Sequence, residues 1–89
     1  MRQLPAAATA PAPLGRALWR CRRGMKELDV LLERFARGAL PQASAAEWVR
    51  FEALLELPDP LLAGYFLGGQ LPQAPEMAGL VLRIRAYVA

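Results

Sequence analysis

Apolar residues recur every three or four positions through most of the chain, which is the spacing of one face of an α-helix. The clearest stripe consists of Met25, Leu28, Leu32 and Phe35. No stretch combines the apolar–polar alternation of a β-strand with flanking turn residues. The pattern therefore predicts an all-α fold, a small bundle of five short helices in which short links make neighbouring helices pack together.

Glycines and a capping pattern mark the ends of the first three predicted helices. The first is expected over about 14–22, and Gly24 separates it from the second, which Gly38 ends. Pro41 to Ala43 form a short link. Ser44 and Glu47 have the spacing of a capping box, so the third helix begins there. Its apolar positions are Trp48, Phe51, Leu54 and Leu55.

Prolines mark the starts of the last two predicted helices. Asp59 is expected as the N-cap of the fourth helix, with Pro60 at its first helical position. We assign both residues to capping first and to partner contact second. Gly68 and Gly69 end this helix, which carries Leu61, Leu62, Tyr65 and Phe66. The fifth helix runs from about Pro75 to the C-terminus, with Met77, Leu80, Val81, Ile84 and Val88 facing inward.

The 89 residues are enough for one small domain. Residues 1–13 are rich in Ala and Pro, and we expect a flexible tail there, followed by one helical domain over 14–89. The first 20 residues lack acids and contain Arg2, Arg16 and Arg20, which is a weak similarity to a mitochondrial transit peptide. A tail on a bacterial cytoplasmic protein is the preferred interpretation.

Composition excludes several kinds of chemistry. The sequence has no histidine and one cysteine, so a zinc site, a Ser-His-Asp or Cys-His catalytic group and an intramolecular disulfide are not expected. No apolar run is long enough for a membrane span, and no glycine-rich phosphate loop is present. These absences predict a protein that is not an enzyme and binds no metal or stable cofactor. Cys21 is interpreted as a small buried hydrophobic residue.

Positive charge is concentrated in one short segment. Five of the 11 basic residues lie between Arg16 and Lys26, although the net charge of +3 is too small to indicate nucleic-acid binding. On a continuous helix Arg16, Arg20 and Arg23 would align, with Glu27 next. The cluster is either a docking face for an acidic or carbonyl-rich protein surface or simply a solvated helix face. Gly24 would break the helix, allow close approach of a partner, or both.

The run from Trp19 to Asp29 resembles the signature of the small flavinylation factors. These form the succinate dehydrogenase assembly factor 2 family, called SdhE in bacteria. The similar positions are Trp19, Cys21, Arg22, Arg23, Gly24, Met25, Glu27, Leu28 and Asp29, continued by Leu54-Leu55-Glu56 and by Asp59-Pro60 with Leu62. The resemblance extends from about Leu18 to the end of the chain.

The resemblance implies an all-α assembly factor that binds the flavoprotein subunit of succinate dehydrogenase, with that of fumarate reductase as a second candidate. The factor would promote covalent attachment of FAD, which belongs to the partner. The implied contact centres on Arg23, Gly24 and Glu27, flanked by Arg20, Met25, Lys26 and Asp29. Trp19, Cys21 and Leu28 are expected to support this face from behind, and Trp19, Trp48 and Phe51 to lie in the core. A cytoplasmic monomer is expected, with a dimer as the alternative.

Two other classes of function stay open. An antitoxin-like regulatory module would bind a different protein and leave flavin content unchanged. A small nucleic-acid-binding protein would show an affinity that falls steeply with salt and survives loss of Glu27. Weak direct binding of FAD is also open, although no pocket motif supports it.

Overall fold

The computed structural model describes residues 12–87, which contain five α-helices and one short 3-10 helix. Their bounds are α2 Ala12–Arg20, α3 Lys26–Gly38, η1 Leu40–Gln42, α4 Ala45–Leu55, α5 Asp59–Phe66 and α6 Pro75–Ala86. No strand occurs within 12–87. The predicted all-α fold of five short helices is therefore confirmed.

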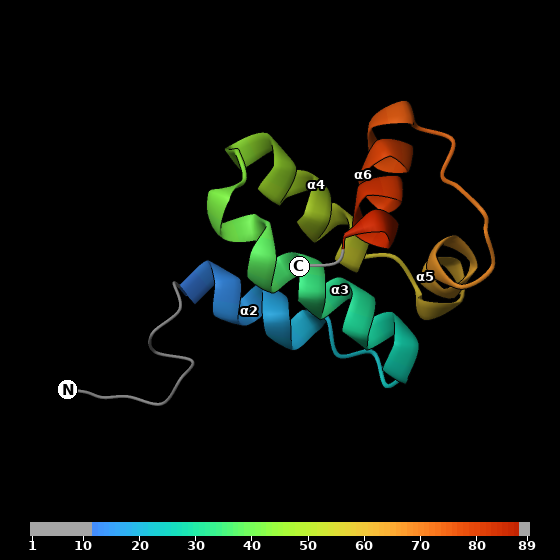
Figure 1. Cartoon of the computed structure of the whole chain (residues 1–89), viewed down its shortest axis with the longest axis horizontal. Helices are drawn as coiled ribbons and strands as arrows, with labels where there is room; N and C mark the ends of the chain where they lie inside the picture. The colour runs from blue at the N-terminus through green and yellow to red at the C-terminus, as the bar shows by residue number, and fades with distance from the viewer. Residues whose placement is uncertain (1–11, 88–89) are drawn as a thin grey trace.

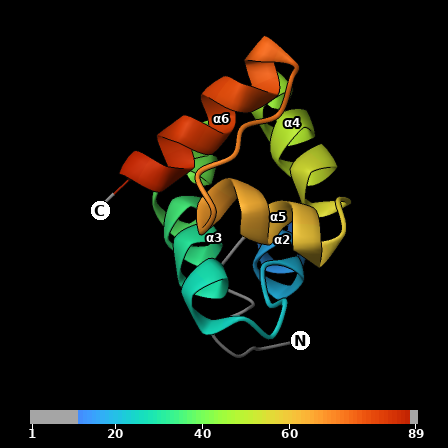
Figure 2. The same cartoon turned by 90° about the vertical axis from the view of Figure 1, so that its right-hand side faces the viewer.

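The helices form two packed pairs joined by α5. α2 and α3 lie side by side, and α4 and α6 pack together on one side of them (Figure 1). α5 contacts both α3 and α6, and the view along the long axis shows it crossing the end of the molecule (Figure 2). This arrangement brings the start of α5 close to the loop between α2 and α3, which is where the signature residues lie.

The core is a single cluster to which every helix contributes. At its centre Phe35 of α3 and Phe51 of α4 stack with ring centroids 5.8 Å apart, and Tyr87 meets the edge of Phe35 at 5.7 Å. Aromatic pairs in such geometries add to the stabilisation that comes from burial. The fully or nearly fully buried apolar side chains include Cys21, Leu28, Leu32, Phe51, Leu54, Leu55, Leu62, Leu80, Val81 and Ile84. Trp48 and Met77 are half-buried against this cluster, and Val88 lies outside the described residues.

Three helix ends differ from the sequence-based expectations. α2 begins at Ala12 and ends at Arg20, two residues earlier at each end than expected, so Ala12 and Pro13 belong to a helix; residues 1–11 of the expected tail lie outside the described part. The link expected at 41–43 includes a 3-10 turn. α6 ends at Ala86, followed by extended Tyr87.

The capping box of α4 is present as predicted, whereas the predicted cap of α5 is wrong. The Ser44 hydroxyl accepts a hydrogen bond from the Glu47 backbone N–H, and the Glu47 carboxylate accepts one from the Ser44 N–H. At α5, Pro58 occupies the N-cap position and makes no side-chain cap bond. Asp59 is instead the first helical residue, because the Pro58 carbonyl accepts the first hydrogen bonds of the helix, and the Asp59 carboxylate contacts Arg23.

Candidate functional site

The signature residues form a tight loop between α2 and α3. Gly24 adopts a φ of +87°, a left-handed conformation that side chains other than glycine rarely take. Asp29, in the first turn of α3, holds the loop through its carboxylate. One oxygen accepts a hydrogen bond from the Arg23 N–H at 2.9 Å and the other accepts one from the Gly24 N–H at 3.2 Å. The expected break at Gly24 is confirmed, and Asp29 fixes its shape.

Arg23 points inward and ties this loop to the rest of the fold. Its side chain is only 15% exposed. Nε donates to the Asp59 carboxylate, one terminal nitrogen donates to the Arg20 carbonyl and the other donates to the Leu57 carbonyl, each at 2.9 Å. The planar guanidinium suits this use because its donors point in fixed, diverging directions. Arg23 thus joins the end of α2 to the link between α4 and α5.

Arg16, Arg20, Arg23 and Glu27 do not align, because the break at Gly24 means that no continuous helix carries them. Arg20 is the last residue of α2 and pairs with Glu56 at 2.7 Å. The Glu27 carboxylate has no ion pair with any other residue of the described range. Glu27 is therefore exposed without a charged partner in this part of the structure.

An exposed patch remains at the tip of the loop and the start of α3. Gly24, Lys26 and Glu27 are exposed, and Met25 is half-buried. A Cβ added at Gly24 would meet nothing within 4 Å, so the space above this backbone is open. A shallow groove between α3 and α5 continues from the patch; its lining residues are Lys26, Glu27, Val30, Leu31, Phe66 and Leu67. The patch combines open backbone, two charges of opposite sign and an adjoining apolar surface.

Trp19 was expected in the core and is 72% exposed, so that prediction is wrong. α2 buries Leu14 and Ala17, the same stripe continues in Cys21 just after the helix, and Trp19 points away from it. The guanidinium carbon of Arg22 lies 5.9 Å from the centre of the indole ring. The helical spacing of the buried stripe was the signal in the sequence that could have placed Trp19 outside.

Cys21 and Leu28 are fully buried behind the loop, as expected. Burial raises the pKa of the Cys21 thiol from 9.0 to about 12, and the nearby Glu33 carboxylate acts in the same direction. A thiol with so high a pKa is a poor nucleophile because almost none of it is ionised near neutral pH. Cys21 therefore supports the fold and offers no reactive thiolate.

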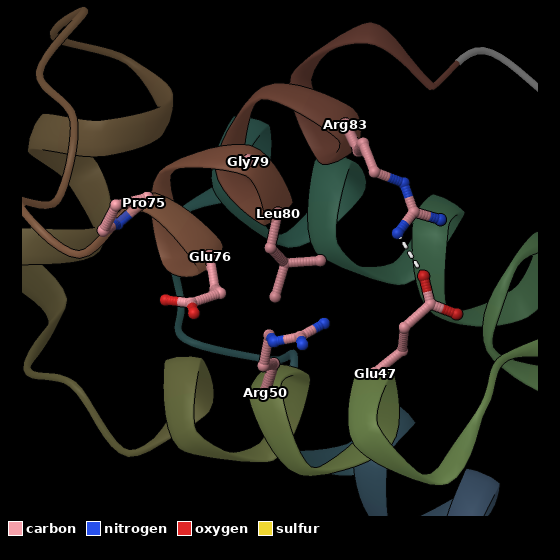
Figure 3. A pocket seen from close by; sticks show the side chains of 7 residues that line it. All are labelled: Glu47, Arg50, Pro75, Glu76, Gly79, Leu80 and Arg83. Atoms are coloured by element: carbon pink, nitrogen blue, oxygen red, sulfur yellow. Dashed lines mark hydrogen bonds and ion pairs between the residues drawn. The ribbon is translucent and has the colours of Figure 1, made fainter.

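A second hollow lies between α4 and α6, on a different part of the surface. Figure 3 shows Arg50 pointing into it from α4 and Glu76 from α6, with an ion pair between Glu47 and Arg83 at one side. This ion pair, assisted by the Ser44 N–H, lowers the pKa of the Glu47 carboxyl. Arg83 also lies over the Phe35 ring at 5.5 Å. Glu47 and Arg83, which line this hollow, therefore also join α4, α6 and the core.

The described residues offer neither a metal site nor a membrane-spanning helix. Within 12–87 there is no group of three or more Cys, Asp or Glu side chains arranged to hold a metal ion. None of the helices in that range is both long enough and apolar enough to cross a membrane.

Comparison with known proteins gives consistent matches over most of the chain. The family described as flavinator of succinate dehydrogenase matches residues 15–88. A protein named FAD assembly factor SdhE from Methylococcus capsulatus is 43% identical over 83% of this chain and 89% of its own length. The protein of the same name from Shewanella oneidensis is 40% identical over 85% of this chain and 93% of its own length. The one from Coxiella burnetii is 42% identical over 75% of this chain and 82% of its own length. No solved structure gives a significant match.

Proposed function

Because the chain belongs to the family of flavinators of succinate dehydrogenase, we propose that it is an assembly factor for that enzyme. It binds the flavoprotein subunit of succinate dehydrogenase and promotes the covalent attachment of FAD to it. The observation that carries the proposal is the match of the flavinator family to residues 15–88. The names of the relatives, FAD assembly factor, agree with it.

The residues of the signature divide into those that contact the partner and those that shape the loop. Gly24, Lys26 and Glu27 make the contact, supported by their exposure and by the open space above Gly24. Arg23 and Asp29 act by holding the loop, since their side chains are engaged in hydrogen bonds within the fold. Arg20 and Met25 flank the contact. The Arg20 side chain is paired there with Glu56.

The chain acts by binding, with no active site of its own, and FAD is held by the partner. The sequence contains no histidine, so a histidine that accepts the flavin belongs to the flavoprotein. Binding holds the domains of the immature subunit so that the reactive carbon of the flavin meets that histidine. Correct positioning of two reacting groups accounts for large rate increases without any catalytic side chain from the helper. We extend the proposal to the flavoprotein of fumarate reductase and to action as a monomer in the bacterial cytoplasm.

The test is the amount of covalent flavin on the flavoprotein subunit in cells that lack this gene. After denaturing electrophoresis, covalent flavin is detected by its fluorescence under ultraviolet light. The gene is returned as wild type, Gly24→Arg, Glu27→Gln or Glu52→Gln. We expect wild type and Glu52→Gln to restore the fluorescence, and Gly24→Arg and Glu27→Gln to lose most of it.

Glu52 is the matched control because it is also an exposed glutamate without an ion pair to another described residue, but it lies on α4. Thermal unfolding of each purified variant shows whether it is folded. Normal fluorescence in the deletion strain would refute the assembly role. Equal restoration by Glu27→Gln and Glu52→Gln would refute the assignment of the contact to the start of α3.

A further inference from the structure

Trp19 has the largest exposed fraction of any large apolar side chain among residues 12–87. It stands on α2, whose opposite face is buried against α3 and is therefore rigid. A folded monomer gains nothing from leaving an indole in water, whereas tryptophan is among the residues most enriched at the centres of protein interfaces. This exposure needs an explanation beyond folding.

Arg22 lies over the indole ring of Trp19 and is itself paired with Glu33. Its guanidinium carbon lies 5.9 Å from the ring centre, and its Nε lies 4.0 Å from a carboxylate oxygen of Glu33 on α3. The Arg22 backbone N–H donates to the Trp19 carbonyl at 3.2 Å. The side chain of the next residue, Arg23, is held by hydrogen bonds to the Arg20 and Leu57 carbonyls. Trp19 and Arg22 are thus preorganised, which lowers the entropy that binding would cost.

We propose that Trp19 and Arg22 anchor a second part of the docking surface, on the outer face of α2, for the same flavoprotein partner. The inference rests on the proposed function and extends it to residues outside the loop tip. The partner would present an apolar depression that receives the indole, with a carboxylate at its rim that meets Arg16, which has no ion pair with another described residue. Arg16 is exposed one helical turn before Trp19.

The two parts of the surface are continuous. On α3, Lys26, Val30 and Glu33 follow each other at four and three positions, so they share one side of the helix. Lys26 belongs to the exposed patch beside Gly24, Val30 is exposed, and Glu33 reaches Arg22. A partner that covers the loop tip can therefore extend over α3 to Trp19 without leaving the surface.

A protein fits this face better than a nucleic acid. Glu33 lies beside Arg22 and Glu56 beside Arg20, and these carboxylates would repel a phosphate backbone. Platforms for single-stranded nucleic acids use several aromatic side chains, on which successive bases stack. Trp19 is the sole exposed aromatic residue within 12–87. One aromatic anchor surrounded by charges of both signs is the pattern of a protein interface.

The test compares Trp19→Ala with Leu82→Ala in binding to the purified flavoprotein subunit that carries non-covalent FAD, measured by calorimetry. Leu82 is a matched control because it is 48% exposed on α6, a helix that packs against α3, α4 and α5. We expect Trp19→Ala to raise Kd about tenfold or more, as for a central interface tryptophan. Leu82→Ala should leave Kd within about twofold, as for a residue outside the interface. Hydroxyl-radical footprinting should show Trp19 protected in the complex, with Trp48 as an internal reference.

The possible outcomes separate this inference from the proposed function. Unchanged affinity of Trp19→Ala, together with loss of binding by Gly24→Arg, would overturn the second docking part and leave the assembly role intact. Failure of the wild type to bind the flavoprotein would overturn both. Tight binding of a single-stranded oligonucleotide that falls with salt and with loss of Trp19 would replace the protein partner by a nucleic acid. Thermal unfolding should show Trp19→Ala to be as stable as wild type, because the side chain is exposed.

Discussion

Arg23 and Asp59 form an ion pair, with Nε 2.9 Å from the carboxylate oxygen, that joins the signature loop to the first turn of α5. The two residues are 36 positions apart in the sequence. The same guanidinium also satisfies the carbonyls of Arg20 and Leu57. The loop therefore owes its shape to a tertiary contact as much as to Gly24, and its shape should be sensitive to changes at either end of that contact.

We predict that Arg23→Ala lowers the free energy of unfolding by about 2–3 kcal/mol, because it removes hydrogen bonds to two backbone carbonyls and a carboxylate at a mostly buried position. Asp59→Asn should cost about 1 kcal/mol or less, since Asp59 is half exposed. Urea denaturation measures both values. Arg22→Ala is the matched control, because Arg22 is 68% exposed and its loss should cost within about 0.5 kcal/mol. Equal stabilities of the Arg22 and Arg23 variants would contradict this account of the loop.

Gly24→Ala should destabilise the fold, although nothing occupies the space beside it. The φ of +87° costs an alanine about 1–2 kcal/mol relative to glycine. Gly79→Ala is the control, since Gly79 lies in α6, also has no atom within 4 Å of an added Cβ, and has no positive φ. That change should stabilise the protein by about 0.5–1 kcal/mol. Opposite signs of the two effects in chemical denaturation would show that backbone conformation decides them, and a stabilising Gly24→Ala would contradict the left-handed assignment.

Cys21 should react with thiol reagents only when the protein unfolds. In the folded state the thiol is buried and its pKa is about 12, so attack requires opening of the fold. We expect labelling near neutral pH to be at least about 100-fold slower than in denaturant. Because the folded pKa is raised, this group contributes its full stability below the unfolded value of 9.0 and loses it as the pH rises from there toward 12.

Cys21→Ala separates the two parts of that prediction. It should abolish labelling and weaken the loss of stability above about pH 9. Rapid labelling of the native wild type, at a rate independent of denaturant, would show that Cys21 is accessible and would contradict its place in the core.

The fold could be predicted from the sequence because most of its elements are set locally. Ser44 and Glu47 form both hydrogen bonds of the capping box within a single helical turn, so their spacing was sufficient to locate the start of α4. Asp59 fails the same kind of prediction for a physical reason. Its neighbours are typical of an N-cap, but its carboxylate is taken by Arg23, and local spacing does not reveal so distant a partner.

The candidate site was predicted only in part, because some of its features depend on local interactions and others on how the helices pack. Gly24 and Asp29 were recognised as important, and the loop that they form follows from interactions within six residues. Trp19 was misplaced because its residue type was weighed above its position. Leu14 and Ala17 of α2, with Cys21 directly after the helix, already define the buried stripe, and Trp19 is not part of it. The proposed docking role of Trp19 rests on its exposure, which is evident only once α2 is placed against α3.

Glu47 makes the stability of the α4–α6 contact dependent on acid. Its carboxylate pairs with Arg83 and accepts the Ser44 N–H, and the Arg83 hydrogen bond is the main cause of its lowered pKa. A lowered folded pKa means that the stabilisation is complete above the unfolded value of 4.5 and disappears as the pH falls through the folded value. The melting temperatures of wild type and Glu47→Gln should therefore differ most near neutral pH and converge in acid.

Arg83→Met distinguishes the ion pair from the capping box, because methionine keeps much of the apolar bulk over the Phe35 ring but removes the charge. The Arg83→Met variant keeps Glu47. If the ion pair is the main source of the acid dependence, this variant should flatten the pH profile of the melting temperature nearly as much as Glu47→Gln does. A profile that stays steep in Arg83→Met would assign the effect to the hydrogen bond from the Ser44 backbone N–H instead, because that donor is the second cause of the lowered pKa of Glu47.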